Sequence, residues 1–243
     1  MKSKPRKKYL VFDGDDTLWG NAWKYMAAEA KILLFLAQRL KDKCRPFGEI
    51  LKLNDKIDTD IARRLGLDKT RFPTSWVETY RQLCQGSGIK PQPKDEQRIY
   101  DLASGFWKPP FRFFPGAKEM LKELHYRGYY LVLLTAGDRE VQQFKVDNSC
   151  AERYFDQVII VPENKTLVLA RFARKFGRSN VAMIGNSAHS DMGPAIKVRA
   201  RGIYVPMSSD DWSYHQLRGV PIRAWQKYIT QIKSLDQILT LFP

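Results

Sequence analysis

The sequence has few cysteines and no long apolar run. Cys44, Cys84 and Cys150 are the only cysteines among 243 residues, and their number is odd. Three scattered thiols exclude a disulfide scaffold and fit a reducing compartment such as the cytoplasm. No apolar stretch reaches the roughly 18 residues that a membrane span requires, so we expect no membrane insertion.

The N-terminal pattern also lacks the length of a secretion signal. Five of the first eight residues are basic, which is how many signal peptides begin. The apolar run that follows covers only residues 9–12 and ends at Asp13, far too short for the apolar core of such a peptide. We therefore expect a soluble, unprocessed protein of the cytoplasm.

Acidic residues are scarce relative to basic ones. The sequence has 41 Lys and Arg against 26 Asp and Glu, a net charge of +15. The excess is spread out, with +5 in residues 1–8, +6 in residues 20–110 and +4 elsewhere. A spread excess favours attraction of small anionic substrates over a dedicated nucleic-acid surface, so we do not expect nucleic acid as the main partner. The pattern gives no indication of oligomeric state.

Short apolar runs alternate with helical patterns through most of the chain. We expect strands at 9–12, 129–134, 157–161, 181–184 and 203–205. We expect helices at 116–127, 139–149, 166–176, 191–199 and 222–241. Each strand is apolar throughout, which is typical of a parallel sheet covered by helices on both faces. The predicted fold is therefore α/β: a doubly wound, Rossmann-like, mostly parallel sheet.

A block without strand patterns interrupts this alternation after the first strand. Apolar residues recur at helical spacing over 22–42, 47–65, 75–85 and 93–107. Turn-rich joints such as 72–74 separate these segments. We therefore assign residues 1–19 and 111–243 to the α/β core and residues 20–110 to an all-helical cap domain inserted in it.

Polar side chains gather where the predicted strands end. In open parallel sheets, ligands bind beyond the carboxyl ends of the strands. The polar residues at those ends are Asp13, Asp15, Thr135, Lys165, Asn186 and Asp191. We expect their loops to converge at one edge of the sheet.

Four motifs occur in order along these loops. Residues 12–18 read F-D-G-D-D-T-L, a D-x-D-x-T pattern that places Asp13 and Asp15 directly after a strand. An apolar run ending at Thr135, then Lys165, then G-N-S-A-H-S-D at 185–191 complete the set. The ordered set resembles the haloacid dehalogenase-like (HAD) superfamily over most of residues 9–215. The forms D-D-T-L-W, T-A-G-D and G-N-S-x-x-S-D resemble a branch of phosphatases within it.

The resemblance implies phosphoryl transfer through an aspartyl-phosphate. Asp13 would be the nucleophile, and Asp15 would protonate the leaving alkoxide and then activate water. Phosphate oxygens would be held by Thr135, the backbone at Ala136, and Lys165. The predicted function is a phosphatase acting on a small phosphomonoester.

The resemblance also implies Mg²⁺, a hard cation that prefers oxygen ligands. The expected ligands are Asp13, the carbonyl of Asp15, and either Asn186 or Asp191, a choice that the sequence leaves open. The assignment of Lys165 as the lysine that binds phosphate is open in the same way, because Lys145 is a second lysine near the predicted phosphate site. Asp138 and Asp191 also precede predicted helices and could act only as N-caps.

Other functions fit parts of the pattern. A dehalogenase needs no acid at the second Asp and no metal, so Asp15 argues against it, and a pump would need membrane spans. A phosphomutase would keep the same residues, and a non-catalytic or nucleic-acid-binding protein could share the core. The branch often has Glu where this chain has Ala22 and Lys where it has Ala136, so a substrate cannot be carried over from relatives. We expect the helical insertion to act as a lid that selects the substrate.

Overall fold

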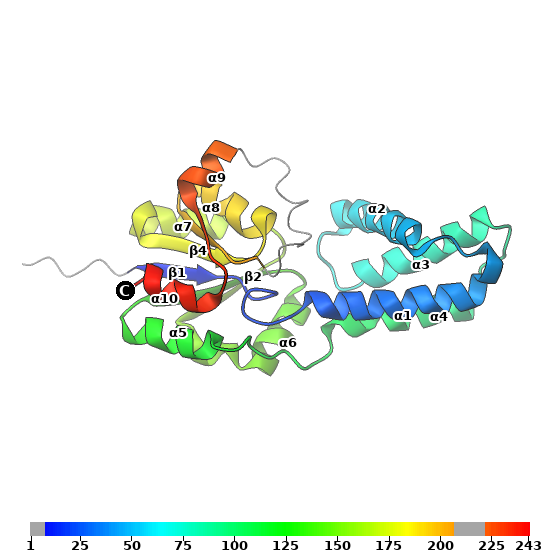
Figure 1. Ribbon diagram of the computed structural model, residues 1–243, viewed down its shortest axis with the longest axis horizontal. Coiled ribbons are helices and arrows are strands. Elements are labelled where there is room, and N and C mark those ends of the chain that lie inside the picture. Colours follow the sequence, from blue (N-terminus) through cyan, green and yellow to red (C-terminus); the bar gives the residue numbers. More distant parts are fainter. Residues whose placement is uncertain (1–7, 207–221) are drawn as a thin grey trace, which may run out of the picture. The chain divides into compact units, whose positions relative to one another are not determined.

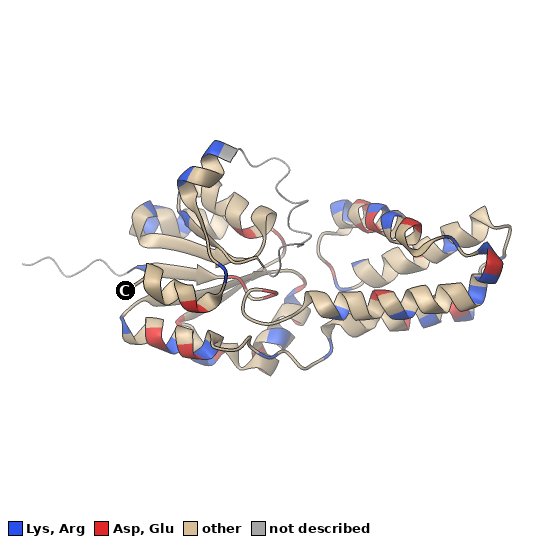
Figure 2. Ribbon diagram, in the orientation of Figure 1, with Lys and Arg blue, Asp and Glu red and all other residues tan. Residues whose placement is uncertain are grey.

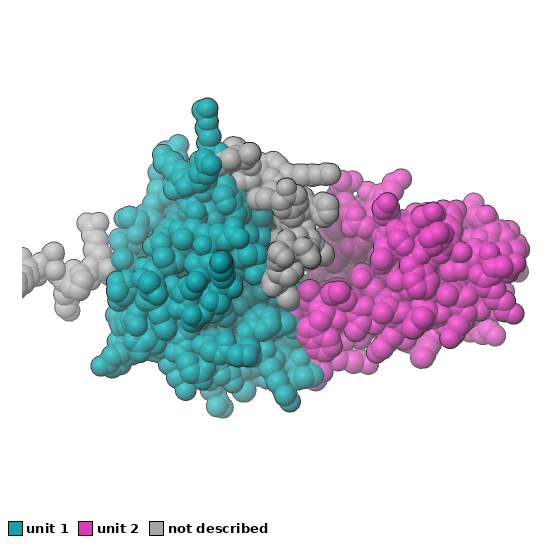
Figure 3. Space-filling view, viewed as in Figure 1, with its two compact units in different colours: residues 1–20, 110–243 teal, residues 21–109 magenta. Residues whose placement is uncertain are grey.

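The computed structural model describes residues 8–206 and 222–243. The chain divides into two compact units (Figure 3). Unit 1 comprises Met1–Gly20 and Pro110–Pro243, and unit 2 comprises Asn21–Pro109. No helix in the described part of the chain is long and apolar enough to cross a membrane. All three cysteines are free.

Unit 1 is built on a six-stranded sheet, which confirms the predicted α/β fold (Figure 1). The strands are β1 (Tyr9–Phe12), β2 (Tyr130–Ala136), β3 (Gln157–Val161), β4 (Val181–Gly185), β5 (Arg201–Tyr204) and β6 (Ile229–Gln231). They follow the order β3-β2-β1-β4-β5-β6, and every neighbouring pair is parallel. The central strand β1 thus lies between β2 and β4, at the point where the chain changes its direction of winding. A crevice at the carboxyl ends of the strands is expected there.

Helices cover both faces of this sheet (Figure 1). They are α5 (Ala117–Tyr126), α6 (Arg139–Ser149), α7 (Thr166–Phe176), α8 (Gly193–Val198), α9 (Ile222–Tyr228) and α10 (Ile238–Leu241). Side chains alternate between the faces, as the period of two in a strand requires. Phe12 packs in the cluster that contains Leu121 of α5, whereas Val11 packs in the cluster that contains Leu169 of α7. The loops after the strands are therefore fixed to a core that is packed on both sides.

Unit 2 is helical, and residues 21–109, all of which the structure describes, contain no strand. Its helices are α1 (Ala22–Leu40), α2 (Phe47–Leu65), α3 (Arg71–Gly86) and α4 (Pro93–Ala103). Fully buried Trp76 and Tyr80 of α3 lie in its interior. The Tyr80 hydroxyl donates to Asp95 Oδ2 at 3.0 Å, which fastens α3 to α4.

Two element predictions need correction. The helix predicted at 75–85 begins earlier, at Arg71, because Pro73 lies in the first turn, where no helical N–H bond is lost. The segment predicted as one helix at 222–241 is interrupted by β6. Its β-branched Ile229 and Thr230 favour an extended backbone, and they pair with Gly202 and Ile203 of β5.

The basic residues are distributed as the sequence predicts. Figure 2 shows Lys and Arg scattered along helices of both units, interspersed with Asp and Glu. Apart from residues 1–8, which carry +5, neither unit carries its excess in one continuous block of the chain. This distribution agrees with the spread of charge along the sequence.

Candidate active site

The loop after β1 presents two carboxylates within three residues. The Gly14 carbonyl accepts a hydrogen bond from Leu18 N at 2.8 Å, which closes a tight turn. A Cβ atom at Gly14 would lie 2.5 Å from the Trp19 ring, so only glycine fits there. The Trp19 indole Nε1 in turn donates to Asp15 Oδ1 at 2.8 Å. The turn and the hydrogen bond from Trp19 therefore fix the position of the Asp15 side chain relative to Asp13.

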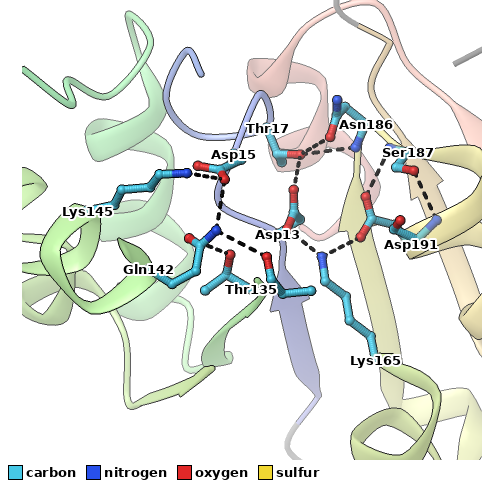
Figure 4. A network of polar contacts seen from close by, with 12 residues as sticks. Asp13, Asp15, Thr17, Thr135, Gln142, Lys145, Lys165, Asn186, Ser187 and Asp191 are labelled. Atoms are coloured by element: carbon cyan, nitrogen blue, oxygen red, sulfur yellow. Dashed lines mark hydrogen bonds and ion pairs between the residues drawn. The ribbon is translucent and has the colours of Figure 1, made fainter. Parts of the chain in front are cut away.

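Asp13 lies in the centre of the polar network in Figure 4. Its side chain is 9% exposed, and its Oδ1 accepts a hydrogen bond from the Lys165 ammonium. The Thr17 hydroxyl lies 3.3 Å from Asp13 Oδ2 and 3.1 Å from Asn186 Oδ1, and it can donate to either oxygen. The same hydroxyl accepts from Asn186 N at 3.0 Å. Thr17 therefore joins the ends of β1 and β4.

Asp191 is fully buried and holds Lys165 from the other side. Its Oδ1 accepts from Lys165 Nζ at 2.7 Å, and its Oδ2 accepts from Ser187 N at 2.9 Å. Asp191 lies within a short π-helical turn, Ala188–Met192, that precedes α8, rather than at the N-cap of a helix. A Cβ at Gly185 would lie 2.3 Å from Asp191 Oδ2, so glycine at the end of β4 makes room for this carboxylate.

Asp15 points away from this group, toward α6 (Figure 4). Its Oδ2 accepts from Lys145 Nζ at 2.6 Å and from Gln142 Nε2 at 3.1 Å. Together with the indole N–H of Trp19, three donors bind one carboxylate. Lys145, rather than Lys165, is thus the partner of Asp15.

The end of β2 connects to the same network through Gln142. Thr135 Oγ1 donates to Gln142 Oε1 at 3.1 Å, and Gln142 Nε2 also donates to the carbonyl of Ala136 at 3.1 Å. The N–H of Gly137 donates to Val161 O at 2.9 Å and so belongs to the sheet. Asp138 accepts from Glu140 N and Val141 N, which makes it the N-cap of α6.

Charges in the site shift the ionisation of its members. Burial raises the pKa of Asp13 to about 7; Asp191 and Asp15 add to the rise, and Lys165 opposes it. Burial alone would lower the pKa of Lys165, but its ion pairs with Asp13 and Asp191 raise it, so the ammonium stays charged. One ammonium therefore serves two buried carboxylates, and negative charge is left in excess above a pH of about 7, where Asp13 is ionised.

The pKa of Asp15 is shifted in the opposite direction to that of Asp13. Burial would raise its pKa, but the Lys145 ion pair outweighs that effect. Hydrogen bonds from Lys145, Gln142 and Trp19 add to the lowering, so the pKa of Asp15 lies below its ordinary value. The two carboxylates of the β1 loop therefore have clearly different environments.

The donor set is compatible with Mg²⁺. In residues 8–206 and 222–243, no group of three or more His, Cys, Asp or Glu side chains is arranged to hold a metal ion. Mixed oxygen donors remain: Asp13 Oδ2 and Asn186 Oδ1 both lie beside the Thr17 hydroxyl, and the Asp15 carbonyl follows on the same loop. Oxygen donors with excess negative charge suit a hard divalent cation. Asp191 is fully buried and both of its oxygens accept hydrogen bonds, whereas Asn186 Oδ1 is contacted, among the described residues, by the Thr17 hydroxyl alone, so Asn186 is the more accessible of the two fourth-motif candidates.

The structure thus brings the predicted site residues together within unit 1 in two hydrogen-bonded groups, one around Asp13 and one around Asp15, which are connected through Gly14 of the β1 loop. The sequence analysis missed Gln142, and it did not assign Lys145 or Trp19 to Asp15. The sequence does contain a signal for Gln142 and Lys145. They lie three residues apart in α6, on the helix face that also carries buried Val141 and Val146. Polar residues on a buried helical face require partners.

A parallel sheet whose first strand ends in two carboxylates, with a buried lysine bridging the first carboxylate to another after the fourth strand, defines the class of HAD-type enzymes. Residues 7–198 match the family of haloacid dehalogenase-like hydrolases. The chain belongs to that family. No curated protein matches the sequence significantly.

Solved structures share the fold over nearly the whole chain. A haloacid dehalogenase-like family hydrolase from Xanthomonas campestris is 22% identical with a TM-score of 0.76, covering 99% of this chain and 92% of that one. YfnB from Bacillus subtilis, whose structure contains magnesium, is 14% identical with a TM-score of 0.57, covering 97% and 98%. An L-2-haloacid dehalogenase from Xanthobacter autotrophicus is 16% identical with a TM-score of 0.53, covering 97% and 98%. A predicted phosphoglycolate phosphatase is also similar, so the shared fold does not select the reaction.

Proposed function

We propose that the protein is a Mg²⁺-dependent phosphatase that hydrolyses a small phosphomonoester through an aspartyl-phosphate on Asp13. The observation that carries the proposal is the second carboxylate, Asp15, held two residues after Asp13 at the end of β1. Displacement of a halide needs only one carboxylate, since the leaving group departs unprotonated. Release of an alkoxide requires an acid, and Asp15 supplies one.

The first step forms one bond and breaks another at phosphorus. A carboxylate oxygen of Asp13 attacks the phosphorus atom as the ester P–O bond breaks. Asp15, which is protonated when the negative charge of the substrate binds beside it, gives that proton to the departing alkoxide. Lys165 stays beside Asp13 and offsets the charge of the incoming phosphate. The Thr135 hydroxyl would turn from Gln142 to a phosphate oxygen in this step.

The second step returns the enzyme to its starting state. Asp15, now ionised, accepts a proton from water as the water oxygen attacks the acyl phosphate and inorganic phosphate leaves. Asp13 regains its free carboxylate. When bound, Mg²⁺ would neutralise the charge that develops on the phosphoryl oxygens. Asp13, Asn186 and the Asp15 carbonyl would hold it.

The test measures inorganic phosphate released from p-nitrophenyl phosphate with Mg²⁺ and with EDTA. We expect turnover only with Mg²⁺. Asp13→Asn keeps the shape of the side chain and removes its nucleophilic charge, so less than about one hundredth of the rate should remain. Turnover that is equal in EDTA, or that survives in Asp13→Asn, would overturn the proposal. Transfer to a second hydroxyl without phosphate release would identify a phosphomutase.

A further inference from the structure

Lys145 is a buried charged group that the steps above leave without a role. Its side chain is 1% exposed, although it lies in the middle of α6. Its Nζ contacts Asp15 Oδ2 at 2.6 Å and lies 5.6 Å from the centre of the Phe111 ring. An ammonium is rarely buried to this degree without a compensating charge, and here Asp15 provides it.

Three donors from two segments fix the Asp15 carboxylate. Lys145 and Gln142 bind Oδ2 from α6, and Trp19 binds Oδ1 from the β1 loop. Both oxygens are engaged, so rotation about the last side-chain bond would break at least two hydrogen bonds. The carboxylate is thus held in one orientation before any substrate arrives.

Gln142 connects this arrangement to the end of β2. Its amide accepts from Thr135 and donates to Ala136 O and to Asp15. The loop is shaped around it: Gly137 has a φ of +142°, and a Cβ there would lie 2.9 Å from Gln142 Nε2. A movement of the Thr135 hydroxyl toward phosphate therefore alters a contact of the residue that holds Asp15.

We propose that Lys145 is a positioning residue for Asp15, acting with Gln142 and Trp19, and that Gln142 links the orientation of Asp15 to phosphate binding at Thr135. The proposal rests on the proposed function. It assigns to α6 the placement of the acid–base group, whereas Lys165 serves the nucleophile.

The test uses Lys145→Met, with two substrates of similar size and different leaving groups. For p-nitrophenyl phosphate, formation of the phosphoenzyme needs little help from an acid, so kcat/KM should stay within about threefold of wild type. Its kcat should fall about tenfold or more, because water attack still requires Asp15 in place. For phenyl phosphate, kcat/KM should also fall about tenfold or more, since the poorer leaving group needs the proton.

A purely structural role would not give this pattern, because loss of folded enzyme lowers kcat and kcat/KM together on both substrates. In an Asp15→Asn background, Lys145→Met should cause little further loss, since the group that it positions is already gone. Lys122→Met, at an exposed position in α5, is the matched control and should behave as wild type. An equal fall in kcat/KM on both substrates would overturn the proposal. So would a fall in rate caused by Lys145→Met that is as large in the Asp15→Asn background as in wild type. If Lys145→Met does not fold, Lys145→Gln replaces it; this variant removes the charge that pairs with Asp15, so the same difference between the two substrates is expected.

A second readout does not depend on turnover. The indole N–H signal of Trp19 in a ¹H–¹⁵N spectrum, assigned by its loss in Trp19→Phe, reports the hydrogen bond to Asp15. We expect it to shift in Lys145→Met and in Asp15→Asn and to stay in place in Lys122→Met. An unchanged signal in Lys145→Met would refute the positioning role. If wild type hydrolyses neither substrate with Mg²⁺ while the signal shifts as expected, the proposed function fails and the arrangement around Asp15 stands.

Discussion

Gly185→Ala tests how much the site depends on Asp191. A Cβ atom at position 185 would lie 2.3 Å from Asp191 Oδ2 and 2.7 Å from Asp191 Cβ. The backbone of Gly185 cannot easily withdraw, because it pairs with Tyr204 in β5 and its carbonyl accepts from Val205 N at 3.0 Å. Asp191 must therefore turn away and lose its bonds to Lys165 and Ser187.

The expected cost follows from the buried ion pair. Removing one partner of a buried pair costs about 3–5 kcal/mol, and we expect the lower end, about 3 kcal/mol, because Lys165 keeps Asp13. Hydrogen exchange of β4 amides reports this loss within unit 1. The control is Gly193→Ala in α8, where the nearest atom to an added Cβ is Ala188 O at 3.6 Å, an ordinary contact. Gly193→Ala should leave the hydrogen exchange of the β4 amides unchanged or make it slower. Wild-type protection in Gly185→Ala would show that Asp191 does not anchor Lys165.

Three further predictions concern the metal ligand and unit 2. Asn186→Ala should sharply raise the Mg²⁺ concentration for half-maximal phosphatase activity, and Asn186→Asp should lower it while raising the substrate requirement; an alanine variant that titrates like wild type would exclude Asn186 as a ligand. Arg71→Met leaves the partly buried Asp58 carboxylate without its cation and should destabilise α2 and α3 by about 1–3 kcal/mol in hydrogen exchange, whereas Arg63→Met, from an exposed pair with Asp60, should change little. Arg64→Gln should alter the ranking of phosphorylated substrates more than the rate on p-nitrophenyl phosphate; equal losses on every substrate would contradict a selective role for unit 2.

The strand ends could be read from the sequence because the apolar runs stop at a polar residue, a glycine or a proline. Asp13 follows Phe12, and Asn186 follows Gly185, so their side chains had to meet at one edge of a parallel sheet. The helical character of residues 21–109 was equally clear from apolar spacing. Local pattern and tertiary structure agree at these positions.

Other features depend on contacts between distant segments. The pairing of β6 with β5 was missed because three residues, Ile229–Gln231, carry too little pattern to compete with the helical residues around them. The sequence also left open which of Lys145 and Lys165 contacts Asp13 and which contacts Asp15, since both are lysines near the same loops. Only the structure shows that α6 faces Asp15, whereas Lys165, immediately before α7, faces Asp13. The choice between Asn186 and Asp191 likewise depends on burial, which the sequence does not give: Asp191 is fully buried.

The central claim is that Asp13 carries a phosphoryl group during turnover. The most direct measurement quenches the enzyme in acid during turnover of p-nitrophenyl phosphate with Mg²⁺, reduces it with borohydride and maps the product by mass spectrometry. An aspartyl-phosphate is reduced to homoserine, and the account predicts homoserine at position 13, in greater yield in Asp15→Asn, where water attack is slowed. Reduction at another residue would contradict this claim, and so would turnover without a reduced residue in wild type and in Asp15→Asn.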